Sequence, residues 1–394
     1  MTMDFSRNIR LLTWQGFFIG FSLWSPIAAI YFSQVSGSFA WGLSIFSVAN
    51  ISGAIFEIPT GVFSDFSDKI GRKYTTMLGG LAYTLSGVAY AIGLNFWWLV
   101  LGAILGGLGR SFYSGNNDAY LYDSLNKSDK KEELAKFMGK IGSAEQWALG
   151  AAAILGGMLA AISFKLVMWL SVIPLLLCFV TSWWLIDIKN KKGEEGGNVY
   201  SHLSEAIKNF LGNKKLRLLS LSSIVGFGIG EAGFHFRSLF VLSLWPLWAI
   251  GVARMLSNIG AAIGFGWSGK IVEKFKAERV LMFEQISSKL IDLVALLWPT
   301  PLSPVLMSTT SIMYGPSTVA ENSIFQNEFT DKQRATMGSL NSLGRSISLA
   351  IFIYGLGWVA DKTDPRIALL CGWTLGLVSV WLTWKLMQMV RKEG

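Results

Sequence analysis

The sequence predicts an all-α membrane protein in which twelve transmembrane helices form two pseudo-symmetric six-helix bundles. Three observations predict this fold class. The 394 residues are 52% hydrophobic and only 15% charged, whereas a soluble protein carries roughly a quarter charged residues. Apolar segments of about 20 residues, long enough to cross a bilayer, recur along the whole chain. Short stretches of the second half also align with the first half without gaps.

Windows of bilayer length place the predicted helices in order. They lie near residues 11–34, 39–63, 74–94, 96–122, 138–161, 164–186, 216–242, 246–270, 278–297, 303–326, 334–358 and 367–389. We interpret the first as a membrane helix and not as a cleavable signal, because its apolar run continues past residue 30 without a small-residue cleavage site. The even count places both termini on one side.

The distribution of basic residues predicts the orientation. The termini, the loops after every second helix and the helix ends next to them hold 26 of the 34 lysines and arginines, and the opposite loops with their helix ends hold three. Cytoplasmic loops are enriched in positive charge. We therefore expect a multi-pass protein of the cell membrane with both termini in the cytoplasm. The net charge of +9 does not predict nucleic-acid binding, because the basic residues lie in these particular loops.

One polar stretch divides the chain. Residues 1–187 are predicted to form the first bundle and residues 216–394 the second, joined by a cytoplasmic linker at 188–215. Within the linker Leu203, Ile207 and Leu211 fall at helical spacing, which favours an amphipathic helix lying on the inner leaflet. A flexible tether is the alternative.

The two halves repeat each other at two places. At an offset of 208 residues Gly61 aligns with Gly269 and Asp65 with Glu273, and at an offset of 203 Asp118 aligns with Glu321. Duplicated halves are typical of secondary-transporter folds. The repeat also bears on the stretch "PTGVFSDFSDKIGRKY" at 59–74, which places acidic and basic residues between two apolar segments.

This stretch resembles the signature of the major facilitator superfamily, Gly-x-x-x-Asp-[Arg/Lys]-x-Gly-[Arg/Lys]-[Arg/Lys], which follows that family's second helix. The matching residues, with a three-residue insertion at 66–68, are Gly61, Asp65, Lys69, Gly71, Arg72 and Lys73. An alternative alignment uses Asp68 without an insertion, but it puts Ser64 in place of the glycine. The internal repeat favours Asp65, because Gly269 and Glu273 keep its spacing.

The resemblance implies a cytoplasmic gate. Asp65 would cap the N-terminus of the eleventh helix, which begins near Arg334, since the helix dipole favours an anion there. Arg72 would pair with an acid at the base of helix 4, for which Asp123 is the candidate. The alternative is that the basic residues only set topology, which leaves the preceding Gly-x-x-x-Asp unexplained.

Two further motifs are similar to a poorly characterised bacterial branch of the superfamily: "RSFYSGNNDAYLYDSL" at 110–125 and "DKQRATMGSLNSLGR" at 331–345. Two differences separate the chain from a typical drug antiporter. Ala103 stands where that group has an arginine in helix 4, and residues 152–157 lack the proline of its helix 5 signature. Drug/proton antiport is therefore one option among several.

Ionisable residues inside membrane helices are costly and are functional candidates by default. Glu231 and His235 are four apart, on one face of the seventh helix, and we interpret Glu231 as the proton-coupling residue. A permanent ion pair of Glu231 with Arg110 or Arg345 is the alternative. The resemblance places these candidates for coupling or for the pathway on lining helices: Glu231, His235, Arg110, Asp118, Glu321 and Arg345. Lys289 and Asp292, on a peripheral helix, are expected to pair with each other.

Polar and aromatic side chains on the same helices are candidates for lining a substrate site, with buried packing as the alternative for each. They are Gln15, Tyr113, Asn116, Asn117, Phe234 and Asn322. No cofactor, metal or direct use of ATP is predicted. The two histidines are distant, the two cysteines are isolated, and "GFGWSGKI" at 264–271 lacks the hydroxyl residue of a phosphate loop.

The predicted function is that of a secondary active transporter, not of an enzyme. It would move a small solute by alternating access as a monomer, coupled to protons and in the direction of efflux, as a multidrug or metabolite antiporter. One alternative is an organic-anion or nutrient uptake carrier, with Arg110 and Arg345 binding an anion. Another is a non-transporting membrane sensor on the same scaffold.

Overall fold

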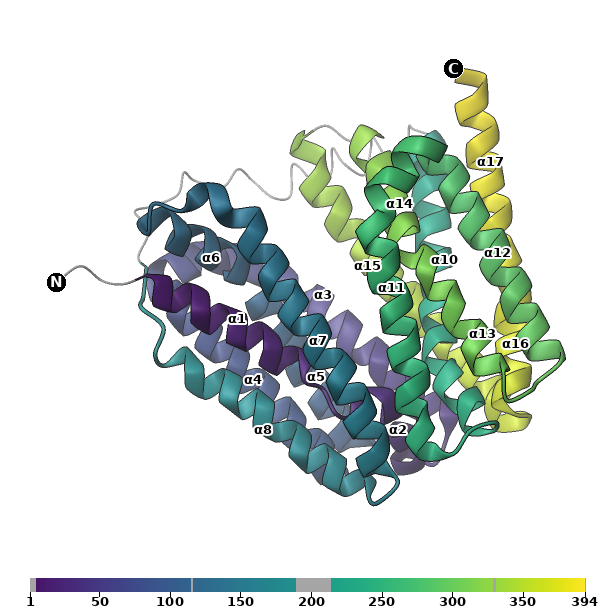
Figure 1. Ribbon diagram of the computed structural model, residues 1–394, viewed down its shortest axis with the longest axis horizontal. Coiled ribbons are helices and arrows are strands. Elements are labelled where there is room, and N and C mark those ends of the chain that lie inside the picture. Colours follow the sequence, from purple (N-terminus) through teal and green to yellow (C-terminus); the bar gives the residue numbers. More distant parts are fainter. Residues whose placement is uncertain (1–4, 115, 189–213, 329–330, 394) are drawn as a thin grey trace. The chain divides into compact units, whose positions relative to one another are not determined.

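The computed structural model describes residues 5–114, 116–188, 214–328 and 331–393 (Figure 1). Within the helices, the side chains of 58–70 and 325–337 lie outside the described residues. The described chain is helical and contains no strand. It forms two compact units: residues 1–37, 45–195 and 247–251 make up the first, and residues 38–44, 196–246 and 252–394 the second. The linker predicted at 188–215 falls almost entirely outside the described residues.

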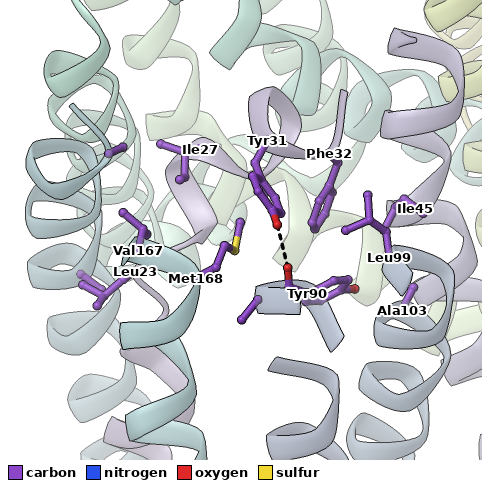
Figure 2. Close-up of a cluster of buried hydrophobic side chains, with 14 residues drawn as sticks. Leu23, Ile27, Tyr31, Phe32, Ile45, Tyr90, Leu99, Ala103, Val167 and Met168 are labelled. Carbon is purple, nitrogen blue, oxygen red and sulfur yellow. Dashed lines mark hydrogen bonds between the residues drawn. The ribbon is translucent and has the colours of Figure 1, made fainter. Parts of the chain in front are cut away.

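The first unit is built from the helices of the N-terminal half. They are α1 (Ser6–Gly20), η1 (Ser25–Ile27), α2 (Ala28–Ser36), α3 (Phe39–Ile70), α4 (Arg72–Ile92), α5 (Phe96–Tyr113), α6 (Asn116–Lys127), η2 (Lys131–Glu133), α7 (Leu134–Ala160) and α8 (Phe164–Ser182). Its main apolar core gathers side chains from α2, α3, α4, α5 and α8. There the Tyr31 hydroxyl donates to the carbonyl of Tyr90 at 2.8 Å, beside Phe32 (Figure 2).

The second unit is built from the helices of the C-terminal half. They are α10 (Lys214–Leu242), α11 (Ile250–Phe275), α12 (Ala277–Leu297), α13 (Ser303–Thr309), η4 (Thr310–Met313), α14 (Tyr314–Glu328), α15 (Asp331–Lys362), α16 (Pro365–Leu375) and α17 (Leu377–Glu393). The short helix η3 (Leu247–Ala249) and the first two residues of α11 cluster with the first unit. The first residues of α3 cluster with this unit. The Asp361 carboxylate there accepts hydrogen bonds from the backbone N–H of Phe39 and Ala40 and so caps the start of α3.

The predicted twelve spans are present, and six of the described helical stretches are long and apolar enough by themselves to cross a bilayer. Several spans are divided in two. The first breaks between α1 and α2, where Pro26 lies in the short 3-10 helix η1, and the fourth breaks after α5 at Ser114. The tenth is likewise split, into α13 and α14. Breaks at corresponding positions in two halves are common in transporters.

The second span is longer than predicted. Instead of ending near residue 63, α3 continues to Ile70, so the signature that was assigned to a loop begins inside the helix. No glycine or proline stands between Gly61 and Gly71 to end it. At Gly71 the backbone reaches a φ of 102°, and α4 starts at the next residue.

Helix packing follows the same scheme in both units. In the first unit α1 packs along α7, while α4 packs against α5 and α8. In the second, α10 packs along α15, while α12 packs against α14, α16 and α17. Each helix pair of the first unit thus has a counterpart six spans later in the second unit, as the duplication in the sequence predicts.

Candidate functional site

The acid–histidine pair of the seventh span lies in the second unit. His235 Nε2 is 3.4 Å from Glu231 Oε1, one turn earlier on α10. Only 11% of the His235 side chain is exposed, against 35% for Glu231. The carboxylate is therefore partly open at the surface of the unit, while the imidazole is held inside it. This is a side-chain pair that can carry a proton.

Arg345 of α15 is held within the same unit by a different acid. Its Nη2 lies 2.6 Å from Glu321 Oε1 on α14, and its Nε donates to Ser223 Oγ on α10 at 2.9 Å. The two residues are a mutually neutralising pair that joins α14 to α15. The permanent pairing of Arg345 with Glu231, one alternative from the sequence, is therefore not what the structure shows.

A second ion pair corrects an expectation. Asp292 of α12 accepts two hydrogen bonds from Arg237 Nη2, at 3.0 and 2.9 Å, instead of pairing with Lys289. Arg237 Nη1 also donates to Thr310 Oγ1 at 3.1 Å. Helical spacing favoured Lys289, but the guanidinium of α10 reaches Asp292 from the facing helix and satisfies both carboxylate oxygens.

Sequence reasoning assigned no role to Arg254, on the second turn of α11. Its guanidinium carbon lies 3.7 Å from the centroid of the Phe234 ring on α10. Phe234 in turn meets the His235 ring edge-on, with centroids 5.9 Å apart. Arg254 thus joins the group formed by Glu231, Phe234 and His235. The signal that could have found it is an arginine inside an apolar span, which is rare.

In the first unit, two substrate-lining candidates are buried among helices. The Gln15 side-chain amide of α1 is fully buried and donates to Ser182 Oγ of α8 at 2.9 Å. The Tyr113 hydroxyl lies 2.9 Å from Cys178 Sγ, also on α8. These contacts fasten α1 and α5 to α8, which favours the packing alternative for both residues.

The remaining candidates differ in exposure. Asn116 is buried and donates to Thr76 Oγ1 at 3.0 Å, and Asn117 accepts from the same hydroxyl at 3.3 Å. Both therefore anchor α6 on α4. Three candidates are exposed on their helices: Arg110 at the end of α5, Asp118 on α6 and Asn322 on α14. The proposed roles of these three residues in the transport pathway stay predictions.

The signature segment is only partly described. Gly61, Asp65 and Lys69 fall in the last turns of α3, where side chains lie outside the described residues. Lys73 Nζ donates to the carbonyl of Trp183, just beyond α8, at 2.7 Å. A Cβ at Gly71 would collide with the carboxylate of Asp187.

The expected contact between the third and fourth spans, from Arg72 on α4 to Asp123 on α6, is present. Arg72 Nε lies 2.5 Å from Asp123 Oδ2, and both side chains are 13% exposed. The pair joins the start of α4 to α6 and lies beside the hydrogen bonds of Asn116 and Asn117. Its part in gating stays a prediction.

The chemistry of these groups is that of charge neutralisation and proton exchange. In the described part of the chain, no cluster of three or more histidine, cysteine or acidic side chains has the geometry of a metal site. In the second unit Arg237–Asp292 and Arg345–Glu321 form ion pairs between apolar helices, and Glu231 and His235 form a pair along one helix. An uncompensated charge there costs at least about 2.5 kcal/mol.

Comparison with known proteins gives concordant results. The family described as the Major Facilitator Superfamily matches residues 12–353. A protein of Methanocaldococcus jannaschii described as an uncharacterized MFS-type transporter is 29% identical over 100 residues, a match that spans 25% of this chain and only 24% of that protein.

Solved structures share the fold at low identity. The nucleoside transporter NupG superposes with a TM-score of 0.81 at 12% identity, covering 98% of this chain and 99% of that one. A bacterial homolog of the human lysosomal transporter Spinster, in an inward-facing and unoccupied conformation, gives 0.73 at 13% identity, covering 100% and 98%. With the family match over most of its length, the chain is a multi-pass membrane transporter and belongs to the Major Facilitator Superfamily.

Proposed function

We propose that the protein is a proton-coupled secondary transporter that expels a small solute by alternating access. The observation that carries this proposal is the Glu231–His235 pair, at 3.4 Å on one face of an apolar helix. A carboxylate gains or loses its charge according to its solvation and its neighbours. Exposure of Glu231 first to one side and then to the other would thus carry a proton across.

The surrounding charges support Glu231 as the group that exchanges protons. Arg237 and Arg345 are already matched by Asp292 and Glu321, and a carboxylate in direct contact with an arginine resists protonation. Glu231 instead contacts an imidazole, which can itself be neutral. The Glu231 carboxylate is thus coupled to a neighbour whose own charge can change.

Transport assays in proteoliposomes test the proposal. Vesicles containing the purified protein and a pH-sensitive dye would be challenged with a panel of solutes, with and without an imposed pH gradient. We expect at least one solute to cause proton movement, and the gradient to drive that solute against the protons. Equal solute flux with and without the gradient would contradict coupling.

Glu231→Gln separates coupling from binding. This variant should lose gradient-driven accumulation and retain downhill exchange, because the amide keeps the shape but cannot exchange a proton. Glu132→Gln, at an exposed position before α7, removes an equal charge outside the spans and should leave both activities unchanged. No flux of any solute or of protons would favour a non-transporting role.

A further inference from the structure

Arg254 differs from the other arginines in the spans of the second unit. Its guanidinium lies over the Phe234 ring, with the central carbon 3.7 Å from the ring centroid. Stacking of this kind uses the flat face of the guanidinium and leaves its N–H edge available. The edge carries donors in a fork that matches the two oxygens of a carboxylate or phosphate.

The neighbouring arginines already have such partners. Arg237 binds both oxygens of Asp292, and Arg345 binds Glu321 and Ser223. In the part of the chain that the structure describes, no carboxylate lies within 4 Å of the Arg254 guanidinium. An arginine inside a span is expensive unless its charge is matched, and among the described residues the fork of N–H donors on Arg254 has no carboxylate in direct contact, which leaves it open to a bound anion.

The surroundings of Arg254 fit a solute with an apolar or aromatic part. Phe234 supplies an aromatic face to Arg254, and the Phe234 ring also meets the His235 ring in an edge-to-face arrangement. Glu231 acts on Arg254 electrostatically, but its carboxylate contacts His235. An anion at Arg254 would therefore lie close to the pair that exchanges protons, which would link binding of the solute to their charge.

We propose that Arg254 binds a carboxylate or phosphate group of the transported solute, so that the solute is an organic anion. This rests on the proposed transport function and names its substrate class. It differs from the anion site that the sequence analysis offered as an alternative, because Arg345 is occupied by Glu321 and Arg110 lies in the first unit.

Equilibrium binding to the full-length protein in detergent tests this proposal. Thermal unfolding would be followed at fixed pH over a concentration series of benzoate, succinate and glycerol phosphate. Benzamide, succinamide and glycerol serve as neutral counterparts, and benzylamine as a cation. We expect a saturable rise in melting temperature with at least one anion and none with its neutral counterpart. Benzoate and succinate against glycerol phosphate separate the two kinds of anion.

Variants locate the site. Arg254→Gln should weaken the binding of the anion at least tenfold, and Arg254→Lys should weaken it less, since an ammonium keeps the charge but loses the fork. Arg217→Gln removes the same charge from an exposed position on the first turn of α10 and should leave binding unchanged. If the Gln variant does not fold, Arg254→Lys decides the question.

Three outcomes would overturn the proposal: no anion of the panel binds, neutral or cationic members bind instead, or the Arg254 variants keep the wild-type affinity. These outcomes are distinct from failure of the transport function. Anion binding lost in Arg254→Gln but without flux in vesicles would reject coupled transport and keep the anion site. Proton-coupled flux of a neutral solute would reject the anion site and keep coupled transport.

Discussion

The Arg237–Asp292 pair shows how single charges are tolerated within apolar helices. Asp292→Asn would remove the charge that neutralises Arg237 and one of its two strong acceptors. Breaking a buried pair in this way costs about 3 kcal/mol, because the remaining cation is left without a counter-charge. We expect a clear fall in melting temperature in detergent.

The matched control is Lys289→Met on the same helix. Methionine keeps most of the apolar stem, and Lys289 is not the hydrogen-bonding partner of Asp292. Its effect should be several-fold smaller than that of Asp292→Asn. A fall in melting temperature of equal size in both variants would instead support the Lys289–Asp292 pair that helical spacing favoured.

Individual charges could be identified from the sequence, but their partners could not. Rarity inside apolar spans was enough to single out Glu231, Arg345 and Glu321. Partners on other helices follow from packing: Arg237 and Asp292 are 55 residues apart, whereas spacing along one helix offers only neighbours three or four residues away. Arg254 is also an arginine inside an apolar span and could have been singled out by the same rarity; only its contact with Phe234 depends on how α10 and α11 pack.

At the scale of elements, Gly71 separates α3 from α4. Its φ of 102° and ψ of 143° lie in a region that is nearly restricted to glycine, and a Cβ would also collide with Asp187. Gly71→Ala should therefore cost about 1–3 kcal/mol. The measurement is the melting temperature of the purified protein. The backbone conformation at Gly71 therefore explains why the signature has a glycine there, whether or not the segment forms a gate.

Gly139→Ala is the matched control for this substitution. Gly139 lies within α7, and nothing is found within 4 Å of a Cβ built there. Alanine is favoured over glycine inside a helix by about 1 kcal/mol, so this variant should melt at or above the temperature of the wild type. If both variants were equally stable, backbone strain and the clash with Asp187 would not explain the glycine at position 71.

The helices themselves were largely predictable, and their breaks were not. Apolar length marks each span because a bilayer sets a minimum. The extension of α3 to Ile70 was missed because its last turns are polar, and hydropathy measures only the part of a helix that lies in lipid. The fourth span breaks after α5 at Ser114, which Gly115 follows in the sequence. A glycine there is a signal for a helix end, but a hydropathy window of bilayer length averages over it.

For the whole molecule, the duplication links sequence to architecture. A few aligned residues in two stretches predicted equivalent halves, and the packing of α1 on α7 recurs as α10 on α15. The site is less symmetric. Two ion pairs between the spans, Arg237–Asp292 and Arg345–Glu321, belong to the second unit. The first unit has the Arg72–Asp123 pair at the start of α4 and buried neutral groups such as Gln15 and Tyr113 within its spans. Duplication fixes a backbone plan, and each half then carries its own side-chain chemistry.

Orientation in the membrane is the property of the whole chain that the charge distribution predicts. Single cysteines in a background without Cys178 and Cys371 can test it with a maleimide that does not cross membranes. Thr363→Cys, between α15 and α16, should react in intact cells. Lys130→Cys, between α6 and α7, should react only after permeabilisation, because 26 of the 34 basic residues lie on its side. The reverse pattern would invert the topology and place the signature segment outside the cell, where it could not form a cytoplasmic gate.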